Sequence, residues 1–355
     1  MINWETEKDL GEKIYDREIT IALIGYGYWG RNLANAISKV PSAKLECVID
    51  PDATNVSEAI QKYDVRSFQD IEEAFQEIEF DAAIVATPAV THENIAERLL
   101  IEGKHVLVEK PMFMNVKEGK KLKDIALEKN LIFMPGHTYL FNSSVVAARK
   151  MISEGIIGSV KTLYTQRLNL GQIRRDVDVF WNLAPHDISI ANYLLGDYPK
   201  FVSAKAGYIT HESLADIGYF TMDFINVGTH HHISWLDPTK TRKVIVIGTE
   251  GMLVIDDVSQ VNKLQLHRKY VINQSKSKET NNYVNLRTVS EDVIFPEIDN
   301  TEPLLNEVSN FVAAIKGENK PNVDANDGIV VAEVINAINR SLVQDGMTVK
   351  VGEND

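Results

Sequence analysis

The sequence has a single cysteine, Cys47, among its 355 residues. One cysteine excludes an internal disulfide and a zinc site built from cysteines. The sequence also lacks a run of about 20 apolar residues, the length that a helix needs to cross a membrane. Residues 1–17 are polar and mixed in charge, without the apolar core of a secretory signal. We therefore expect a cytoplasmic protein without a membrane partner.

The sequence also has fewer basic than acidic residues. Lysine and arginine number 37 against 50 aspartates and glutamates, a formal net charge of -13. A nucleic-acid partner requires a basic surface, so we expect none. An anionic small ligand is still compatible with this charge, because a helix N-terminus can bind phosphate locally. The length favours two globular domains.

Short apolar segments alternate with helical segments in the first part of the chain. The expected strands are residues 19–24, 44–50, 81–87, 105–108 and 131–134, and the expected helices are 33–40, 71–79, 94–102 and 116–129. Such alternation predicts βαβ units and a doubly wound parallel sheet. We therefore predict an α/β protein with a Rossmann domain at residues 19–140, after a polar extension at residues 1–18.

The pattern changes after residue 140, where strands follow one another without helices between them. We expect strands at 158–167, 201–209, 217–224, 228–235, 242–248 and 251–256, and helices at 145–154, 187–195, 304–316 and 325–342. This predicts an α+β domain at residues 141–355 with an open-faced, largely antiparallel sheet, its last helices either within it or packed on the first domain. Residues 273–285 are polar and predict a mobile excursion or a long hairpin.

A glycine-rich sequence joins the first strand to the first helix. Gly25, Gly27 and Gly30 fit the pattern G-x-G-x-x-G, with Tyr28 and Trp29 inside it. After a buried strand and before a helix, this pattern is typical of dinucleotide binding. The first glycine permits the tight turn, the second the approach of a pyrophosphate, and the third close helix–strand packing.

Two further positions lie at the carboxyl ends of expected strands, where ligands bind in such sheets. Asp50 follows Gly25 by 25 residues, and an acidic residue near this spacing accepts hydrogen bonds from the adenosine ribose. The same charge repels a 2′-phosphate, which favours NAD over NADP. Thr87 and Pro88 end the third strand and are predicted cofactor contacts.

Glu109, Lys110 and Pro111 follow the strand at 105–108 directly. A charged pair at the end of a buried strand is costly without a partner or a task. The proline disfavours helical geometry at Lys110. A partly buried lysine has a lowered pKa and can donate or accept a proton near neutral pH.

With these elements the sequence resembles the glucose–fructose oxidoreductase/inositol dehydrogenase (Gfo/Idh/MocA) family. The resemblance rests on the glycine loop, on Ala86-Thr87-Pro88 with His92 after it, on residues 103–111 and on the helices at 311–315 and 328–342. It implies an NAD(P)-dependent oxidoreductase for a small sugar substrate, with cofactor contacts that include His92, Glu109 and Lys110. It also implies a homo-oligomer, which we expect to be a dimer or tetramer.

The resemblance implies a second part of the site near residue 186. Family members carry Asp-x-x-x-His where this sequence has Asn182 and His186, so the family aspartate is replaced by an amide that cannot carry charge. His186 is then an acid/base candidate, aimed by Pro185 and a helix that follows. Lys110 would form a hydrogen bond with the same substrate oxygen as His186. The resemblance leaves open which of the two residues takes the proton.

Other polar residues are candidates by position only. Substrate contacts at His137, Tyr139, Asn142 and Arg167 are one interpretation, and purely structural roles are the other. Arg174, next to Arg175, either binds an anionic part of the substrate or lies in a solvated loop. The run His230-His231-His232 has no carboxylate in pattern, so we expect a sheet surface and no metal site.

Three functions are compatible with these residues. The segment 178–188 resembles enzymes that oxidise the 3-hydroxyl of a nucleotide-linked amino sugar, such as UDP-N-acetylglucosamine or its uronate. A dehydrogenase for a free sugar or inositol is the first alternative. The second is a non-catalytic sensor of NAD or sugar on the same fold. The retention of Lys110 and His186 argues against the sensor, whereas Asn182 is in its favour.

Overall fold

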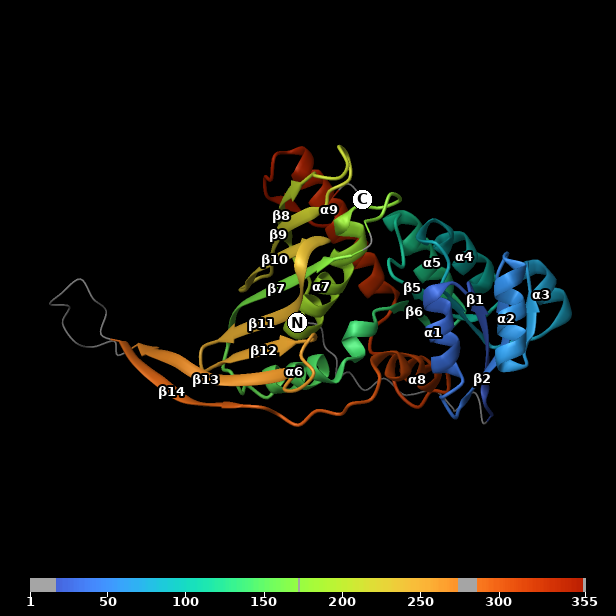
Figure 1. The fold of residues 1–355 in the computed structure, drawn as a ribbon, viewed down its shortest axis with the longest axis horizontal. Coiled ribbons are helices and arrows are strands. Elements are labelled where there is room, and N and C mark those ends of the chain that lie inside the picture. Colours follow the sequence, from blue (N-terminus) through green and yellow to red (C-terminus); the bar gives the residue numbers. More distant parts are fainter. Residues whose placement is uncertain (1–16, 172, 274–285, 354–355) are drawn as a thin grey trace. The chain divides into compact units, whose positions relative to one another are not determined.

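The computed structural model describes residues 17–171, 173–273 and 286–353, and its contacts divide them into two compact units (Figure 1). The first unit contains residues 17–141 and 301–333, and the second contains the described residues of 142–300 together with 334–353. Within the described residues, no helix is long and apolar enough to cross a membrane.

The first unit is built on a six-stranded parallel sheet in the order β3-β2-β1-β4-β5-β6. Its strands are β1 (Ile19–Ile24), β2 (Ala43–Ile49), β3 (Arg66–Phe68), β4 (Ala82–Val85), β5 (His105–Glu109) and β6 (Phe133–Gly136). Its helices are α1 (Tyr28–Ile37), α2 (Ala53–Tyr63), α3 (Ile71–Glu77), η1 (Ala89–Thr91), α4 (His92–Ile101), α5 (Val116–Glu128), η2 (Thr138–Phe141), α8 (Pro303–Ile315) and the beginning of α9 (Ala325–Val343). This strand order confirms the predicted Rossmann fold.

Burial explains which of these elements the sequence reveals. Ile19, Ile21 and Leu23 of β1 are fully buried, as expected for a parallel strand covered on both faces. Helix α2 and strand β3 were not predicted from the sequence. Ala59 is the buried residue of α2, so this helix carries little of the apolar periodicity on which helix prediction depends. Asp52 begins α2 by accepting a hydrogen bond from the Thr54 amide at 2.8 Å.

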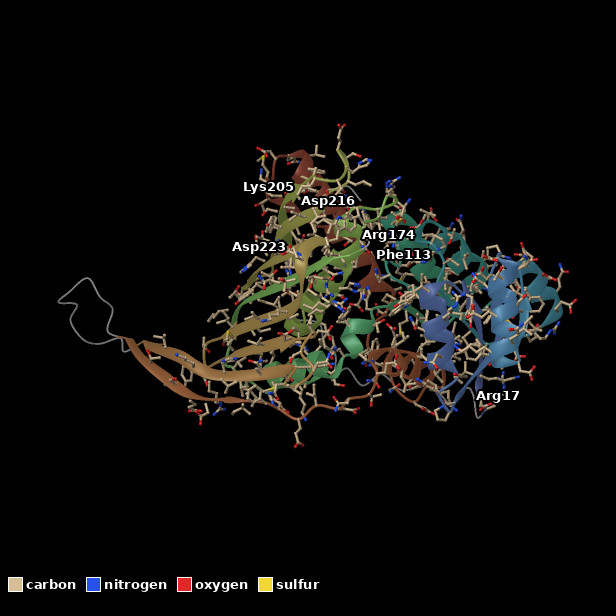
Figure 2. The ribbon with its side chains drawn as sticks, in the orientation of Figure 1. Arg17, Phe113, Arg174, Lys205, Asp216 and Asp223 are labelled. Carbon is tan, nitrogen blue, oxygen red and sulfur yellow. The ribbon has the colours of Figure 1, made fainter. Side chains whose placement is uncertain are left out.

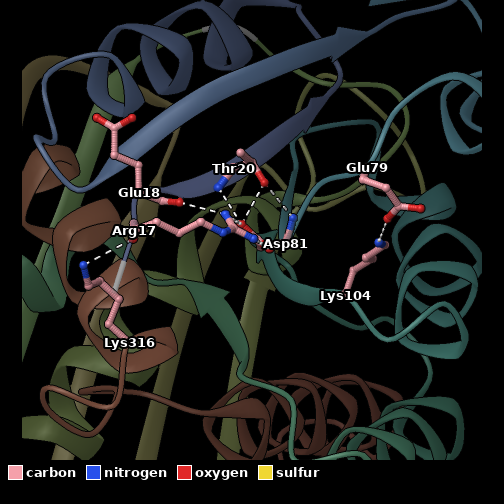
Figure 3. Close-up of polar contacts among 7 residues, drawn as sticks. All are labelled: Arg17, Glu18, Thr20, Glu79, Asp81, Lys104 and Lys316. Atoms are coloured by element: carbon pink, nitrogen blue, oxygen red, sulfur yellow. Dashed lines mark hydrogen bonds and ion pairs between the residues drawn. The ribbon is translucent and has the colours of Figure 1, made fainter. Parts of the chain in front are cut away.

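Charged side chains form a network of hydrogen bonds at the amino ends of the strands of this sheet (Figure 3). Arg17 donates two hydrogen bonds of 2.7 Å to Asp81, which precedes β4. Asp81 also accepts from the amide and hydroxyl of Thr20 in β1, at 2.9 and 2.7 Å. Lys316, after α8, donates to the Arg17 carbonyl at 3.3 Å. This network joins β1, β4 and the end of α8 at one edge.

The second unit is built on a nine-stranded sheet in the order β14-β13-β12-β11-β7-β10-β9-β8-β15. Its strands are β7 (Val160–Leu170), β8 (Phe201–Gly207), β9 (Ile217–Asp223), β10 (Gly228–Ser234), β11 (Leu236–Gly248), β12 (Met252–Asp256), β13 (Leu264–Asn273), β14 (Leu286–Ile294) and β15 (Val349–Lys350). Its helices are α6 (Ser143–Ser153), α7 (Val179–Leu195) and the remainder of α9. All neighbouring strands are antiparallel except β7 and β10, which confirms the largely antiparallel prediction.

The two faces of this sheet differ. Along β9, Gly218, Phe220 and Met222 are buried, whereas Tyr219 and Thr221 between them are exposed. Helix α7 packs against β7, β9 and β10. One face of the sheet is therefore covered by helix and the other is open within this unit.

Two expected boundaries in this unit are wrong. Helix α7 begins at Val179 and not at residue 187, because Pro185 lies inside the helix instead of opening it. Strand β11 begins at Leu236 and not at residue 242. Strands β13 and β14 pair antiparallel on either side of residues 274–285, where an excursion or hairpin was expected and which lie outside the described residues; Figure 1 shows this pair extending beyond the other strands.

Asp216, before β9, is a fully buried carboxylate. Figure 2 shows it at the opposite end of β9 from Asp223. It accepts hydrogen bonds from the amides of Ile209 and Thr210 at 2.7 Å, the Thr210 hydroxyl at 2.6 Å and the Trp235 indole at 2.7 Å. Burial raises its pKa, but these hydrogen bonds outweigh burial and lower the pKa to about 2.

We predict that Asp216→Asn destabilises the protein by about 2–4 kcal/mol at pH 7, because the amide cannot accept all four donors. Since the folded pKa lies below the ordinary value of 3.8, the stabilisation is complete above pH 4 and is lost as pH falls toward 2. Urea unfolding of both proteins should show a stability difference that is constant above pH 4 and shrinks below it. A difference independent of pH down to 2 would contradict this account.

Candidate active site

The glycine loop between β1 and α1 has the geometry that the sequence predicts. Gly25 has a φ of +93°, and a Cβ there would lie 2.6 Å from the Ala86 carbonyl oxygen. A Cβ on Gly30 would lie 2.1 Å from the Gly25 carbonyl oxygen, whereas one on Gly27 would have no neighbour within 4 Å. Tight turning and close packing therefore account for Gly25 and Gly30, and the backbone at Gly27 is open to a ligand. Tyr28 begins α1 with its side chain 84% exposed.

Asp50, after β2, is buried against this loop. Its Oδ2 accepts the Tyr26 amide at 2.6 Å, and its Oδ1 accepts the Asp52 amide at 2.9 Å and the Asn55 side chain at 3.1 Å. An ionised carboxylate has about four acceptor positions, so one position is left for a ribose hydroxyl. The open Gly27 backbone and an acid at the end of β2 are a donor and acceptor set that fits the adenosine half of NAD.

His92 joins the ends of β4 and β5. Its ring nitrogens lie 2.9 Å from the carbonyl oxygens of Thr87 and Pro111, and its side chain is almost completely buried. Burial lowers its pKa. Its contacts position the two segments that contain Thr87 and Lys110, so its part in cofactor binding, predicted from the sequence, would be indirect. Pro88 is exposed, and its carbonyl accepts the Thr91 amide at 2.9 Å.

Glu109, the last residue of β5, is connected to the glycine loop. The Trp29 indole donates a hydrogen bond to its Oε1, and the Lys110 amide donates to its Oε2 at 3.1 Å. A Cβ on Gly136, its neighbour in β6, would lie 3.1 Å from the Glu109 carboxyl carbon. The peptide bond between Lys110 and Pro111 is cis. The Lys110 side chain is half-buried at this edge of the sheet.

A third buried carboxyl group lies in the same unit and was not predicted from the sequence. Glu307 of α8 is fully buried and accepts a hydrogen bond from the Thr138 hydroxyl at 2.8 Å. The sequence could have indicated this burial, because Glu307 falls on the apolar stripe of the helix formed by Leu304, Val308 and Phe311. His137 precedes Thr138 and is 2% exposed, and burial, aided by the Lys110 charge, lowers its pKa to about 4.

His186 lies on α7 in the second unit, whereas Lys110 lies in the first. Residues four apart on a helix share a face, so Asp178, Asn182 and His186 form one stripe. All three are half-buried, while Pro185 and Asp187 beside His186 are buried. Asp178 is the N-cap of the helix and accepts the Trp181 amide at 3.0 Å; burial raises its pKa.

Three of the predicted substrate contacts have partners within their own unit. Arg167 of β7 donates to Asp187 at 2.9 and 3.2 Å, a buried ion pair next to His186. Asn142 caps α6, accepting the Ser144 amide and donating to Asp257, both at 2.9 Å. Arg174 lies after β7 (Figure 2) and donates to Asp176 at 2.9 Å. Tyr139 is half-buried in η2. Substrate binding by these residues stays a prediction.

The three histidines of β10 are accounted for by packing. His231 is buried between the hydroxyls of Thr165 and Thr229, each 2.8 Å from a ring nitrogen. On the open face, the rings of His230 and Tyr164 stack with centroids 4.9 Å apart, and those of His232 and Tyr219 with centroids 4.3 Å apart. Among the residues that the structure describes, no group of three or more histidine, cysteine, aspartate or glutamate side chains could hold a metal ion.

The glycine geometry predicts opposite effects of one methyl group at two positions. We expect Gly30→Ala to destabilise the protein by about 1–3 kcal/mol through overlap with the Gly25 carbonyl. We expect Gly27→Ala to cost much less stability but to lower the affinity for NAD at least tenfold, because its methyl group enters the space that the cofactor approaches. Thermal unfolding and calorimetric titration of both variants test this. Equal losses of stability would contradict it.

Known proteins share both halves of this architecture. Residues 19–137 match the oxidoreductase family with an NAD-binding Rossmann fold (GFO/IDH/MocA), and residues 145–254 match the GFO/IDH/MocA C-terminal domain. The 2,7-anhydro-N-acetylneuraminate hydratase of Escherichia coli is 26% identical over 267 residues, 70% of each chain. The inositol 2-dehydrogenase of Rhizobium meliloti is 24% identical over 343 residues, 92% of this chain and 97% of that one.

A third relative is the UDP-N-acetylglucosamine 3-dehydrogenase of Acidithiobacillus ferrooxidans. It is 29% identical over 183 residues, 51% of this chain and 56% of its own. Its solved structure covers 92% of this chain and 98% of that chain with a TM-score of 0.75 at 21% identity, a likeness of fold. Because the two family matches together cover more than half of the sequence, this chain belongs to the GFO/IDH/MocA family and is an NAD-dependent oxidoreductase.

Proposed function

We propose that the protein is a dehydrogenase that oxidises a secondary hydroxyl of a sugar or cyclitol. The observation that carries this proposal is the position of Lys110. It follows a carboxylate that is hydrogen-bonded to the glycine loop, so the lysine is fixed relative to the cofactor-binding backbone. The relatives named as inositol and UDP-N-acetylglucosamine dehydrogenases support the substrate class.

Lys110 and His186 would have different roles toward the substrate. Bound NAD would supply the acceptor for the hydride that leaves the carbinol carbon. The Lys110 ammonium is a compact point charge suited to stabilising the developing alkoxide. An unperturbed imidazole titrates near pH 6.5 and can take the hydroxyl proton, which is the role we propose for His186.

The helix that carries His186 supports this role. The buried Arg167–Asp187 ion pair ties α7 to β7 beside the histidine. Pro185 removes one intrahelical hydrogen bond without ending the helix. Asn182, one turn before His186, can donate and accept hydrogen bonds to a sugar hydroxyl, and Asp178 is the acidic residue of the same stripe.

For the substrate we propose a nucleotide-linked amino sugar oxidised at its 3-hydroxyl, such as UDP-N-acetylglucosamine or its uronate. The A. ferrooxidans relative supports this choice. The paired state of Arg174 favours the alternative, a free sugar or inositol, because a guanidinium bound to Asp176 must exchange that partner before it can bind a diphosphate. The R. meliloti relative, similar over nearly its whole length, supports the same alternative.

We also propose that the chain forms a homo-oligomer, a dimer or tetramer, in the cytoplasm. The open face of the nine-stranded sheet supports the proposal of a homo-oligomer. Tyr219 is 51% exposed there beside the stacked ring of His232, and exposed aromatic side chains are frequent in interfaces.

We predict that Lys110→Ala and His186→Ala each lower turnover about 100-fold or more, while calorimetry shows unchanged NADH binding. Lys104→Ala and His211→Ala are matched controls: Lys104 precedes the same strand and pairs with Glu79 at 3.2 Å, and His211 lies in an exposed loop. Both controls should retain wild-type turnover. Wild-type turnover in either of the first two variants would remove that residue from the mechanism.

The substrate class is tested by thermal unfolding with saturating NADH. The ligands are UDP-N-acetylglucosamine, its uronate, UDP, free N-acetylglucosamine and inositols. A ligand at 100 times its Kd adds about 2.7 kcal/mol of stability, which is visible without turnover. We expect stabilisation by the UDP-sugars and none by free sugars. Stabilisation by inositol or a free sugar alone would replace the nucleotide-sugar proposal by the alternative.

A further inference from the structure

Arg31 of α1 lies one side chain away from Asp50, the residue predicted to bind the adenosine ribose. Asn55 of α2 donates a hydrogen bond to Asp50 Oδ1 at 3.1 Å and accepts one from Arg31 Nη2 at 3.0 Å. The Arg31 guanidinium also lies over the Tyr26 ring, with its carbon 5.1 Å from the ring centroid. The Tyr26 amide in turn donates to Asp50 Oδ2 at 2.6 Å. Two separate sets of contacts therefore place this guanidinium near the Asp50 carboxylate.

Glu58 of α2 forms a bidentate ion pair with the same guanidinium. Arg31 donates through Nε to Glu58 Oε1 at 2.9 Å and through Nη2 to Glu58 Oε2 at 2.7 Å. Together with the bond to Asn55, these contacts use all three N–H groups of Nε and Nη2. Arginine binds a phosphate through the same kind of paired N–H groups. Glu58 and a phosphate would therefore compete for this edge of Arg31.

The pairing of Arg31 has a consequence for the choice of cofactor. A 2′-phosphate on the adenosine ribose distinguishes NADP from NAD, and in dinucleotide-binding sheets a nearby arginine accommodates it. A free Arg31 would offset the negative charge of Asp50 and would attract that phosphate. In its ion pair with Glu58 it adds no net charge, so the repulsion of a 2′-phosphate by Asp50 is not offset.

We propose that Glu58 determines cofactor specificity as a positioning residue, because it occupies the Arg31 guanidinium and so prevents it from binding the 2′-phosphate of NADP(H). Discrimination against NADP(H) then depends on two carboxylates. Asp50 repels the phosphate, and Glu58 withdraws the arginine that would counteract this repulsion. The inference rests on the NAD-binding domain of the first unit and is independent of the substrate proposed above.

The ratio of the Kd of NADPH to the Kd of NADH tests the proposal. Calorimetric titration gives the Kd of NADH, and displacement of NADH gives that of NADPH where direct binding is weak. The Arg31 and Glu58 side chains are 35% and 43% exposed, so a phosphate can replace the carboxylate without opening the core. We expect Glu58→Gln to lower the Kd of NADPH by about three- to tenfold, because a competing ion pair and a repelling charge are both removed. The Kd of NADH should change less than about twofold.

A second substitution separates the release of Arg31 from the loss of negative charge at Glu58. Arg31→Met keeps an apolar contact with the Tyr26 ring but cannot bind a phosphate. In the Glu58→Gln protein, Arg31→Met should return the NADPH to NADH ratio to within about twofold of wild type. The gain in NADPH affinity therefore requires the arginine as well as the absence of its partner.

Glu72→Gln is the matched control. Glu72 of α3 binds Arg98 of α4 in the same bidentate way, with distances of 2.6 Å to Nε and 2.8 Å to Nη2. The substitution removes the same charge from the same kind of partly exposed pair in the same unit. It should leave the NADPH to NADH ratio unchanged. A merely structural role of Glu58 would change thermal stability without changing this ratio.

The wild-type protein alone can overturn the proposal, whether or not the variants fold. Equal affinity for NADPH and NADH would refute it while leaving the oxidoreductase assignment intact. An unchanged ratio in a folded Glu58→Gln protein would also refute it. A gain that persists after Arg31→Met would refute the role of the arginine and assign the effect to repulsion by Glu58. If neither cofactor bound, the proposed function and this inference would fail together.

Discussion

Side-chain hydrogen bonds hold together the carboxyl edge of the six-stranded sheet, and the candidate site depends on them. Parallel strands pair along their length but end in loops whose backbone groups need other partners. Asp50 binds the glycine loop to the end of β2, His92 binds the end of β4 to the segment after β5, and Trp29 binds the glycine loop to Glu109. These side chains thus join four strand ends, in addition to backbone hydrogen bonds such as that from the Gly25 amide to the Ile49 carbonyl.

The same constraint explains where buried charge is tolerated. Asp216 is stable as an anion because four donors converge on it, and Asp187 because Arg167 pairs with it. Glu307 has neither arrangement, so its burial is compatible only with a proton. A buried acid that is neither paired nor solvated is a structural liability.

The sequence predicted the parts of the fold that depend on local pattern. Buried apolar strands, glycines at fixed spacing and the charged end of β5 are visible along the chain, and they led to the Rossmann sheet, the glycine loop and the place of Lys110. The start of α7 was wrong because proline is common at the first turn of a helix and Pro185 was taken for that position. Helix α2 was missed because its surface is almost entirely solvated.

Partners distant in the sequence could not be predicted in this way. Arg167 and Asn142 look like binding residues until their bonds to Asp187 and Asp257 are known. The interaction of Glu307 with Glu109 joins positions 198 residues apart, and no local pattern specifies it. One feature of this interaction is visible in the sequence, because a glutamate on the apolar stripe of α8 departs from the expected pattern of apolar and polar residues. Such departures are expected at functional positions.

The residues proposed for cofactor binding and the proposed acid/base His186 lie in different units. The residues proposed to contact the cofactor, among them Asp50, Glu109 and Lys110, lie in the first unit. His186, the proposed acid/base, lies in the second unit, on a helix whose stripe of Asp178, Asn182 and His186 is half-buried. Replacement of the family aspartate by Asn182 changes the charge of that stripe without altering the helix. A shared fold does not determine such side chains, so membership of the family does not by itself identify the substrate.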